Sequence, residues 1–200
     1  QQFENGILAS GIPFSISSRS TKHAHHYVHS KCEEIFSKVL KMGFKISNPF
    51  SRLTKHDEYQ KMIKVIGKQL AEELAKIAPS CWHLNAGYKY NGQSKRNGIP
   101  CGICVPCIVR QTAHPLNTWL NLKDDEIRNH RIYGRNFREY YTFLSKIRKT
   151  SSEPIQKFYI AIGKQNLYGA SLQSSYELTE IRDLFVQFAD EFFSTFKVSI

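Results

Sequence analysis

The chain has 200 residues, 41% of them hydrophobic, which suits one domain of ordinary size or part of a larger protein. No apolar run approaches the roughly 20 residues of a membrane-spanning helix, so we expect no membrane-embedded segment. The formal net charge is +11, and residues 1–150 carry 24 Lys and Arg against 11 Asp and Glu. Such an excess favours polyanionic partners such as nucleotides, RNA or DNA, although many enzymes that bind ATP or tRNA share it.

The N-terminal quarter predicts loops followed by one helix. Glycine and proline interrupt the first 20 residues, which favours loop and short strand. The His cluster at residues 23–29 contains an i, i+4 pair, but no third metal ligand accompanies it, so the polar start of a helix is the favoured interpretation. An apolar stripe predicts a helix from Val28 to Leu40 that ends at Gly43, with Cys32 buried. Residues 44–46 are a candidate strand.

Two helices are predicted before the first cysteine of the central cluster. Thr54 is a good N-cap, since Asp57 and Glu58 fall in the first turn that follows. The second helix covers Lys68 to Ala78, with Leu70, Leu74 and Ile77 expected to face inward. Residues 85–98 are rich in Gly, Asn and Lys and predict an exposed basic loop.

The second half of the chain is predicted to be mainly helical. The expected helices cover residues 106–114, 124–130, 136–149 and 176–196. A Phe stripe at helical spacing in the last one is typical of a buried core. Residues 158–162 predict a short strand or a buried segment.

Four cysteines form the most informative pattern in the sequence: Cys81, Cys101, Cys104 and Cys107. Zinc prefers a tetrahedron of deprotonated ligands at about 2.3 Å, and two consecutive C-x-x-C steps supply three thiolates from one knuckle, in which Gly102 permits close backbone approach. Cys81 would close the site, leaving no position for water, so a structural metal is predicted. The alternative is a redox C-x-x-C or a disulfide pair, which three clustered cysteines and a distant fourth fit less well.

Other catalytic patterns are missing from the sequence. It contains no Ser-His-Asp arrangement, no paired-carboxylate constellation and no G-x-x-x-x-G-K-[ST] phosphate loop. Residue types alone therefore predict a helix-rich basic domain with a structural zinc knuckle. Such a domain fits a nucleic-acid-binding module about as well as an enzyme.

The cysteine block also resembles a known family. Ser80-Cys81-Trp82, followed by Cys-Gly-Ile-Cys-Val-Pro-Cys-Ile-Val-Arg at residues 101–110, resembles the zinc signature S-C-x(n)-C-G-x-C-x-x-C-x-x-R of the QueC family, the 7-cyano-7-deazaguanine synthases of queuosine biosynthesis. Residues 3–6, 48–50 and 54–55 resemble further segments of the C-terminal half of these proteins. The similarity is greatest to the divergent QatC-type members of bacterial anti-phage operons.

The resemblance covers about residues 3–115 and implies a domain organisation and a fold. Residues 1–115 would be a QueC-like C-terminal half with the zinc knuckle at 81–107, and residues 116–200 a helical C-terminal extension. The implied fold class is α/β, a parallel sheet of the adenine-nucleotide alpha-hydrolase (ATP pyrophosphatase) type, of which this chain is the helix-rich C-terminal part. Because the chain begins at Gln1 without an initiator Met, we expect a piece of a longer protein, with a removed tag or a processed terminus as the alternative.

The resemblance also implies an activity. Family members are ATP-dependent carbon–nitrogen ligases that convert a 7-deazaguanine carboxylate to an amide and then a nitrile, with ATP and magnesium as cofactors besides the structural zinc. This chain departs from the family pattern in two features. The S-G-G-x-D-S loop that grips nucleotide phosphates is absent from this chain, and the spacer between Cys81 and Cys101 is longer than in the biosynthetic enzymes. We therefore expect the 200 residues alone to be inactive toward ATP.

By its resemblance to the family motif, the chain has these zinc ligands: Cys81, Cys101, Cys104 and Cys107. Arg110 follows the knuckle and is a candidate for binding an anion or the substrate, with a helix-surface salt bridge as the equal alternative. Glu4 and Asn5 are candidates to face the substrate, or else a turn-forming pair. Lys55 is a candidate phosphate ligand, or else a solvated residue at a helix N-terminus. No catalytic residue is assigned.

Two functions from different classes follow. The preferred one is part of a QueC-like enzyme acting on a deazaguanine-type substrate with a nucleotide, with nucleic acid or operon-encoded proteins as further partners. The competing one is a non-catalytic zinc-knuckle domain that binds nucleic acid or a partner protein. Since no targeting segment is recognisable, a cytoplasmic location is expected for either.

Overall fold

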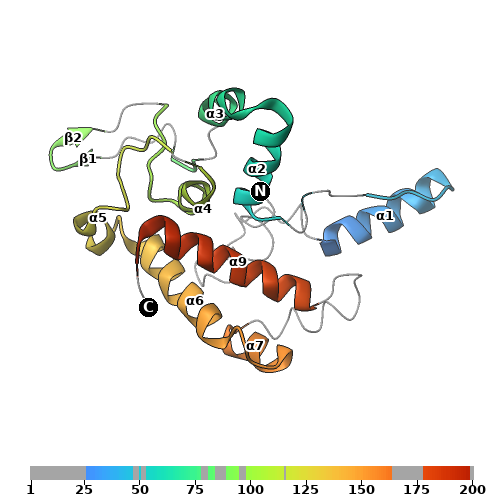
Figure 1. Ribbon diagram of the computed structural model, residues 1–200. Coiled ribbons are helices and arrows are strands. Elements are labelled where there is room, and N and C mark those ends of the chain that lie inside the picture. The colour runs from blue at the N-terminus through green and yellow to red at the C-terminus, as the bar shows by residue number, and fades with distance from the viewer. Residues whose placement is uncertain are drawn as a thin grey trace. The chain divides into compact units, whose positions relative to one another are not determined.

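The computed structural model describes residues 26–46, 50, 53–77, 81–83, 89–94, 98–114, 116–163 and 178–198. The helices are α1 (His26–Leu40), α2 (Lys55–Ile66), α3 (Lys68–Ile77), α4 (Val105–Ala113), α5 (Asp125–Asn129), α6 (Arg135–Thr150), α7 (Ile155–Ala161) and α9 (Leu178–Phe196). The strands are β1 (Lys89–Tyr90) and β2 (Gln93–Ser94), an antiparallel pair (Figure 1). The expectation of a helix-rich chain is confirmed. Within these ranges the one sheet is this hairpin, so the parallel sheet stays a prediction.

Contacts divide the chain into two compact units. One unit draws on the residues before Thr54 and on residues 143–189; the other combines residues 54–142 with residues 190–200. The four cysteines all belong to the second unit. The predicted boundary after residue 115 stays a prediction. No helix in the described ranges has both the length and the apolar character needed to cross a membrane.

Helix α1 differs from its prediction at its C-terminal end. It ends at Leu40 and not at the predicted Gly43, and Lys41 has a positive φ of 53°. Residues 44–46 are not a strand, because the backbone N–H of Phe44 donates to Ser37 Oγ at 2.9 Å and its carbonyl accepts from the same hydroxyl at 3.4 Å. Cys32 is half-buried, not buried as expected.

Helix α7 replaces the strand predicted at residues 158–162. Phe158, Tyr159 and Ile162 are buried, and their spacing puts them on one helical face, so the alternative of a buried segment is confirmed. The Tyr159 hydroxyl donates to the carbonyl of Leu178 at 2.8 Å, at the start of α9. Burial raises the pKa of this phenol.

Helices α2, α3 and α4 enclose a small core in the second unit. Thr54 caps α2 as predicted: its hydroxyl accepts from Asp57 N, and the Asp57 side chain accepts from Thr54 N. Gly67, at a φ of 82°, separates α2 from α3. The buried cluster consists of Tyr59, Ala71, Ala75 and Ala113.

The prediction that the Leu and Ile side chains of α3 face inward is wrong. Leu70 is 46% exposed, Leu74 39% and Ile77 75%, whereas Ala71 and Ala75 are buried. The small alanine side chains allow close approach of the neighbouring helices, and this contact outweighs the larger apolar area of the leucine stripe.

The hairpin lies inside the segment predicted as a loop. Asn91 and Gly92 have φ values of 48° and 75°, so both central residues of the turn are left-handed, as a type I′ hairpin requires. The Tyr133 hydroxyl donates to the carbonyl of Lys89 at 2.5 Å, and the Tyr90 hydroxyl donates to Glu126 Oε1 at 2.7 Å. These contacts hold the hairpin against α5 and the turn after it.

Aromatic rings join the first half of α6 to the end of α9 within the second unit. Phe137 stacks on Phe192 with ring centroids 5.2 Å apart and meets the edge of Phe196 at the same distance. Tyr140 stacks on Phe192 at 6.2 Å. These four rings are buried, which confirms the expectation that the Phe stripe is core.

Candidate metal centre

The four predicted cysteines converge in the structure. Their sulfur atoms all lie within 4.8 Å of one another. Cys104 Sγ lies 3.9 Å from Cys81 Sγ, and Cys101 Sγ lies 4.0 Å from Cys107 Sγ. A tetrahedron with metal–sulfur bonds of about 2.3 Å has sulfur–sulfur edges of about 3.8 Å. The arrangement therefore matches a cage that can hold one metal ion.

The separations do not match disulfide bonds. All five cysteines of the chain are free thiols, and a disulfide needs its two sulfurs about 2.05 Å apart. A redox pair needs two cysteines, whereas here the sulfur of Cys81 lies within 4.8 Å of the sulfurs of three others. The geometry thus favours metal binding over the disulfide alternative.

Gly102 makes the tight turn of the knuckle possible. Its φ is 86°, in the left-handed region, and a Cβ atom there would lie 1.9 Å from the carbonyl oxygen of Leu120 and 2.9 Å from Cβ of Thr118. Both the backbone conformation and the lack of space exclude a side chain. The close approach that the sequence suggested for this glycine is confirmed.

Three hydrogen bonds fix the carbonyl groups of the knuckle. Leu120 N donates to the carbonyl of Cys101 at 3.1 Å, and Gln111 Nε2 donates to that of Gly102 at 2.8 Å. Asn136 Nδ2, from the first turn of α6, donates to the carbonyl of Ile103 at 3.0 Å. The turn is therefore positioned by segments that follow it in sequence, and no spacing rule identified these three residues beforehand.

Helix α4 carries the third cysteine of the knuckle into the core. Cys104 occupies the N-cap position and Pro106 the first turn, where a missing backbone N–H costs no hydrogen bond. All residues from Cys101 to Arg110 are buried, whereas Cys81 is half-buried. Because the cage is closed by four sulfurs and surrounded by protein, a metal held there would have a structural role.

The four cysteine thiols can all be ionised together only when a cation is bound between them. Hydrogen bonds from neighbouring thiols, first that of Cys101, lower the pKa of the Cys81 thiol. The backbone N–H groups of Cys101 and His83 also donate to Cys81 Sγ, at 3.2 and 3.3 Å. Interactions with the other thiols, first Cys101, raise the pKa of Cys104, and burial acts in the same direction. Four thiolates this close repel one another, so binding a metal displaces the remaining thiol protons.

Arg110 is anchored inside the protein. Only 7% of it is exposed; its Nη2 donates to the carbonyl of Ala75 at 2.5 Å and lies 3.4 Å from His114 Nε2. The residue is therefore buried and ties α4 to α3, whereas the predicted alternative was a position on the helix surface. Its predicted contact with a substrate stays a prediction.

The remaining predicted site residues lie elsewhere. Lys55 is the first residue of α2 and pairs with Glu58 at 2.5 Å, both side chains being about a fifth exposed. Its predicted phosphate contact stays a prediction. Glu4 and Asn5 lie outside the described residues, as do His23 and His25. Among the predicted site residues that the structure describes, it brings together the four cysteines of the cage.

Comparisons with known proteins leave the family of the chain undetermined. A scan of family models and searches of curated proteins and of solved structures gave no match to this chain. The QueC resemblance therefore stays a prediction that rests on the motif around the cysteines.

Proposed function

We propose that the chain is the zinc-bearing portion of a QueC-like, ATP-dependent enzyme that acts on a 7-deazaguanine or related nucleobase in anti-phage defence. One observation carries the proposal: Cys81 closes the cage with Cys101, Cys104 and Cys107, the residues of the S-C…C-G-x-C-x-x-C-x-x-R motif. The motif glycine and arginine each have a structural part in this arrangement, since Gly102 permits the turn and Arg110 anchors the helix behind it.

Zinc is the metal that suits this cage best. Four thiolates in tetrahedral order are typical of structural zinc, and hard cations such as magnesium prefer oxygen ligands. The zinc would hold the segment before Cys81 to the knuckle and so fix the long spacer between them. In this proposal the zinc does not take part in the reaction, and ATP and magnesium bind to a part of the protein that carries the phosphate loop.

The test begins with the metal and continues with the activity. Purified under reducing conditions, the chain should contain one zinc per molecule, and Cys104→Ser should lower this content while Cys32→Ser leaves it unchanged. The full-length gene product should consume ATP when given 7-carboxy-7-deazaguanine, whereas the 200 residues alone should not. A zinc-loaded full-length protein without substrate-dependent ATP consumption would contradict the enzymatic part of the proposal and leave the metal assignment intact.

A second candidate is a non-catalytic zinc domain that binds nucleic acid or a partner protein. The observation that favours it is the hairpin in the spacer, on which Lys89 is exposed in a chain of net charge +11. Lys95 and Arg96 follow the hairpin and lie outside the described residues. Replacing all three by Gln should flatten the salt dependence of binding to RNA or DNA, because fewer counterions are released. An unchanged slope would remove the hairpin from the interface.

A further inference from the structure

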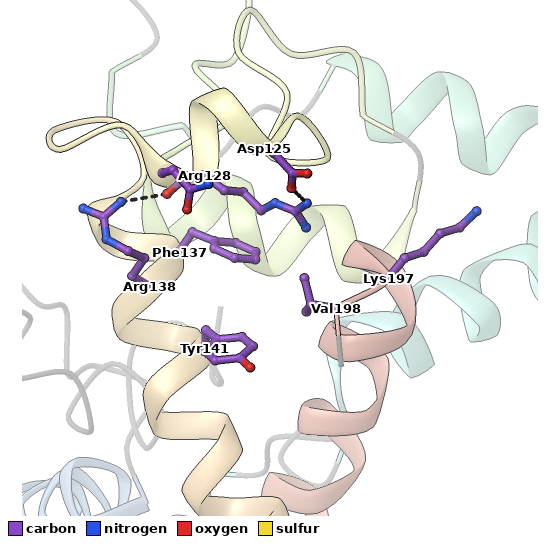
Figure 2. A pocket seen from close by; sticks show the side chains of 8 residues that line it. Asp125, Arg128, Phe137, Arg138, Tyr141, Lys197 and Val198 are labelled. Atoms are coloured by element: carbon purple, nitrogen blue, oxygen red, sulfur yellow. Dashed lines mark hydrogen bonds and ion pairs between the residues drawn. The ribbon is translucent and has the colours of Figure 1, made fainter. Parts of the chain in front are cut away.

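A groove in the second unit lies outside the motif that suggested the QueC family. It has a volume of about 490 Å³, within the range of pockets that accept ligands. We call it the Arg128 groove; its lining residues are Asp125, Arg128, Asn129, Phe137, Arg138, Tyr141, Lys197 and Val198. They come from α5, α6 and the residues after α9, as Figure 2 shows.

The charge of the groove is positive. The lining residues include three cations (Arg128, Arg138 and Lys197) and one carboxylate (Asp125), so together they carry a net charge of +2. Asp125 forms an ion pair with Arg128. Arg138 donates to the carbonyl groups of Arg128, His130 and Arg131 at 2.7 to 3.0 Å, and these three partners carry no formal charge. Such a surface attracts anions.

Aromatic rings form the floor of the groove. The guanidinium of Arg128 lies over the ring of Phe137, 5.7 Å from its centroid, and also donates to the carbonyl of Phe196 at 3.2 Å. Tyr141 is one turn further along α6 and meets the edge of Phe193 with ring centroids 5.6 Å apart. Tyr141 is half-buried, so part of its side chain is exposed to solvent at the groove.

The cations and rings are arranged along the groove. In Figure 2, Arg138 and Lys197 lie at opposite margins, with Phe137 and Tyr141 between them. Positive charge on both sides of an apolar and aromatic floor is the arrangement that binds single-stranded nucleic acid, in which phosphates flank each stacked base. We propose that the Arg128 groove binds a nucleotide unit of single-stranded RNA or DNA, with its base at Tyr141 and its flanking phosphates at Arg138 and Lys197. This proposal depends neither on the metal nor on the QueC resemblance.

The test uses a fluorescent ten-residue oligothymidylate and the reduced, metal-loaded chain, with anisotropy measured from 50 to 200 mM salt. Lys197→Gln should weaken binding about threefold to tenfold and reduce the salt slope by about 0.7, the loss of one phosphate contact on a single strand. Lys64→Gln removes the same charge from an exposed position on α2, outside the groove, and should change neither quantity. Equal effects of the two variants would overturn the proposal in favour of diffuse attraction.

A second pair of variants tests the stacking ring. Tyr141→Phe keeps the ring and should retain binding, whereas Tyr141→Leu should weaken it about tenfold with the thermal midpoint of each variant measured alongside. Equal binding by the two variants would overturn the stacking role. Thymidine monophosphate should bind about tenfold more weakly than the oligonucleotide, because it offers one phosphate in place of the two that flank a base within the strand. Comparable affinity would also overturn the proposal and indicate a small-ligand site.

Discussion

The cysteine knuckle and the aromatic cluster are both buried, but different interactions stabilise them. The knuckle, residues 101–107, consists mostly of small side chains whose backbone is fixed by hydrogen bonds from Leu120, Gln111 and Asn136. The aromatic cluster, the rings of Phe137, Tyr140, Phe192 and Phe196, is held by ring contacts. Both regions are buried, but they differ in what they need to be stable. The knuckle brings its three sulfurs together with that of Cys81 and needs a cation, whereas the aromatic cluster is stabilised by contacts between its own rings.

Removing the metal should reveal the largest difference in stability between the knuckle and the aromatic cluster. Chelation at neutral pH should unfold the knuckle, because binding free energies of about 10–16 kcal/mol for structural zinc are folding free energy. Amide hydrogen exchange should show loss of protection at residues 101–113 and retained protection at 137–141. Acidification should act in the same direction, since protons compete for the thiolates. Uniform loss of protection in both regions would mean that the aromatic cluster also depends on the metal.

Phe192→Ala should destabilise the aromatic cluster and leave the knuckle intact. Removing a fully buried ring that contacts Phe137, Tyr140 and Phe196 should cost about 3–5 kcal/mol of unfolding free energy. The zinc content should stay at one per chain. Ile132→Ala, at a position that is 69% exposed, is the control and should have little effect. Denaturant melts give both values, and loss of zinc from the Phe192 variant would contradict the independence of the regions.

Gly102→Ala should destabilise the knuckle without removing a metal ligand. The positive φ costs about 1–2 kcal/mol for alanine, and the contact with the Leu120 carbonyl adds overpacking of about 1–3 kcal/mol. Gly98→Ala is a matched control, because Gly98 has a similar φ of 82° but no atom within 4 Å of an added Cβ. The difference between the two variants measures the steric contribution. Equal melting curves would show that the turn can move away from Leu120.

Asn136→Ala should have the smallest effect and should involve both regions. Its side chain joins the first turn of α6 to the carbonyl of Ile103 in the knuckle, and losing one such hydrogen bond costs about 1 kcal/mol. Asn129→Ala, at the exposed end of α5, serves as the control. A competition assay with a chromophoric chelator should show faster zinc release from the Asn136 variant. Release at the rate of the unsubstituted chain would mean that this bond does not support the knuckle.

The sequence determined those features that depend on neighbours along the chain. Helix positions other than that of α7 followed from apolar periodicity, and the start of α2 followed from Thr54 and Asp57, since capping involves residues three apart. The three knuckle cysteines were equally predictable, because a C-x-x-C step brings its sulfurs together by local geometry alone. Cys81 was assigned because a closed zinc site needs a fourth ligand and because it matches the Ser-Cys of the QueC motif, and the structure places it in the cage.

Tertiary contacts decided the rest. Periodicity showed that α3 has an apolar stripe, but packing against α2 and α4 buried Ala71 and Ala75 and left Ile77 exposed. The anchoring of Arg110 on the Ala75 carbonyl and the assembly of the Arg128 groove likewise join residues far apart in sequence. Local propensity is a property of a segment, whereas the choice of buried face depends on the shape of the partner surface. Only the folded chain supplies that surface.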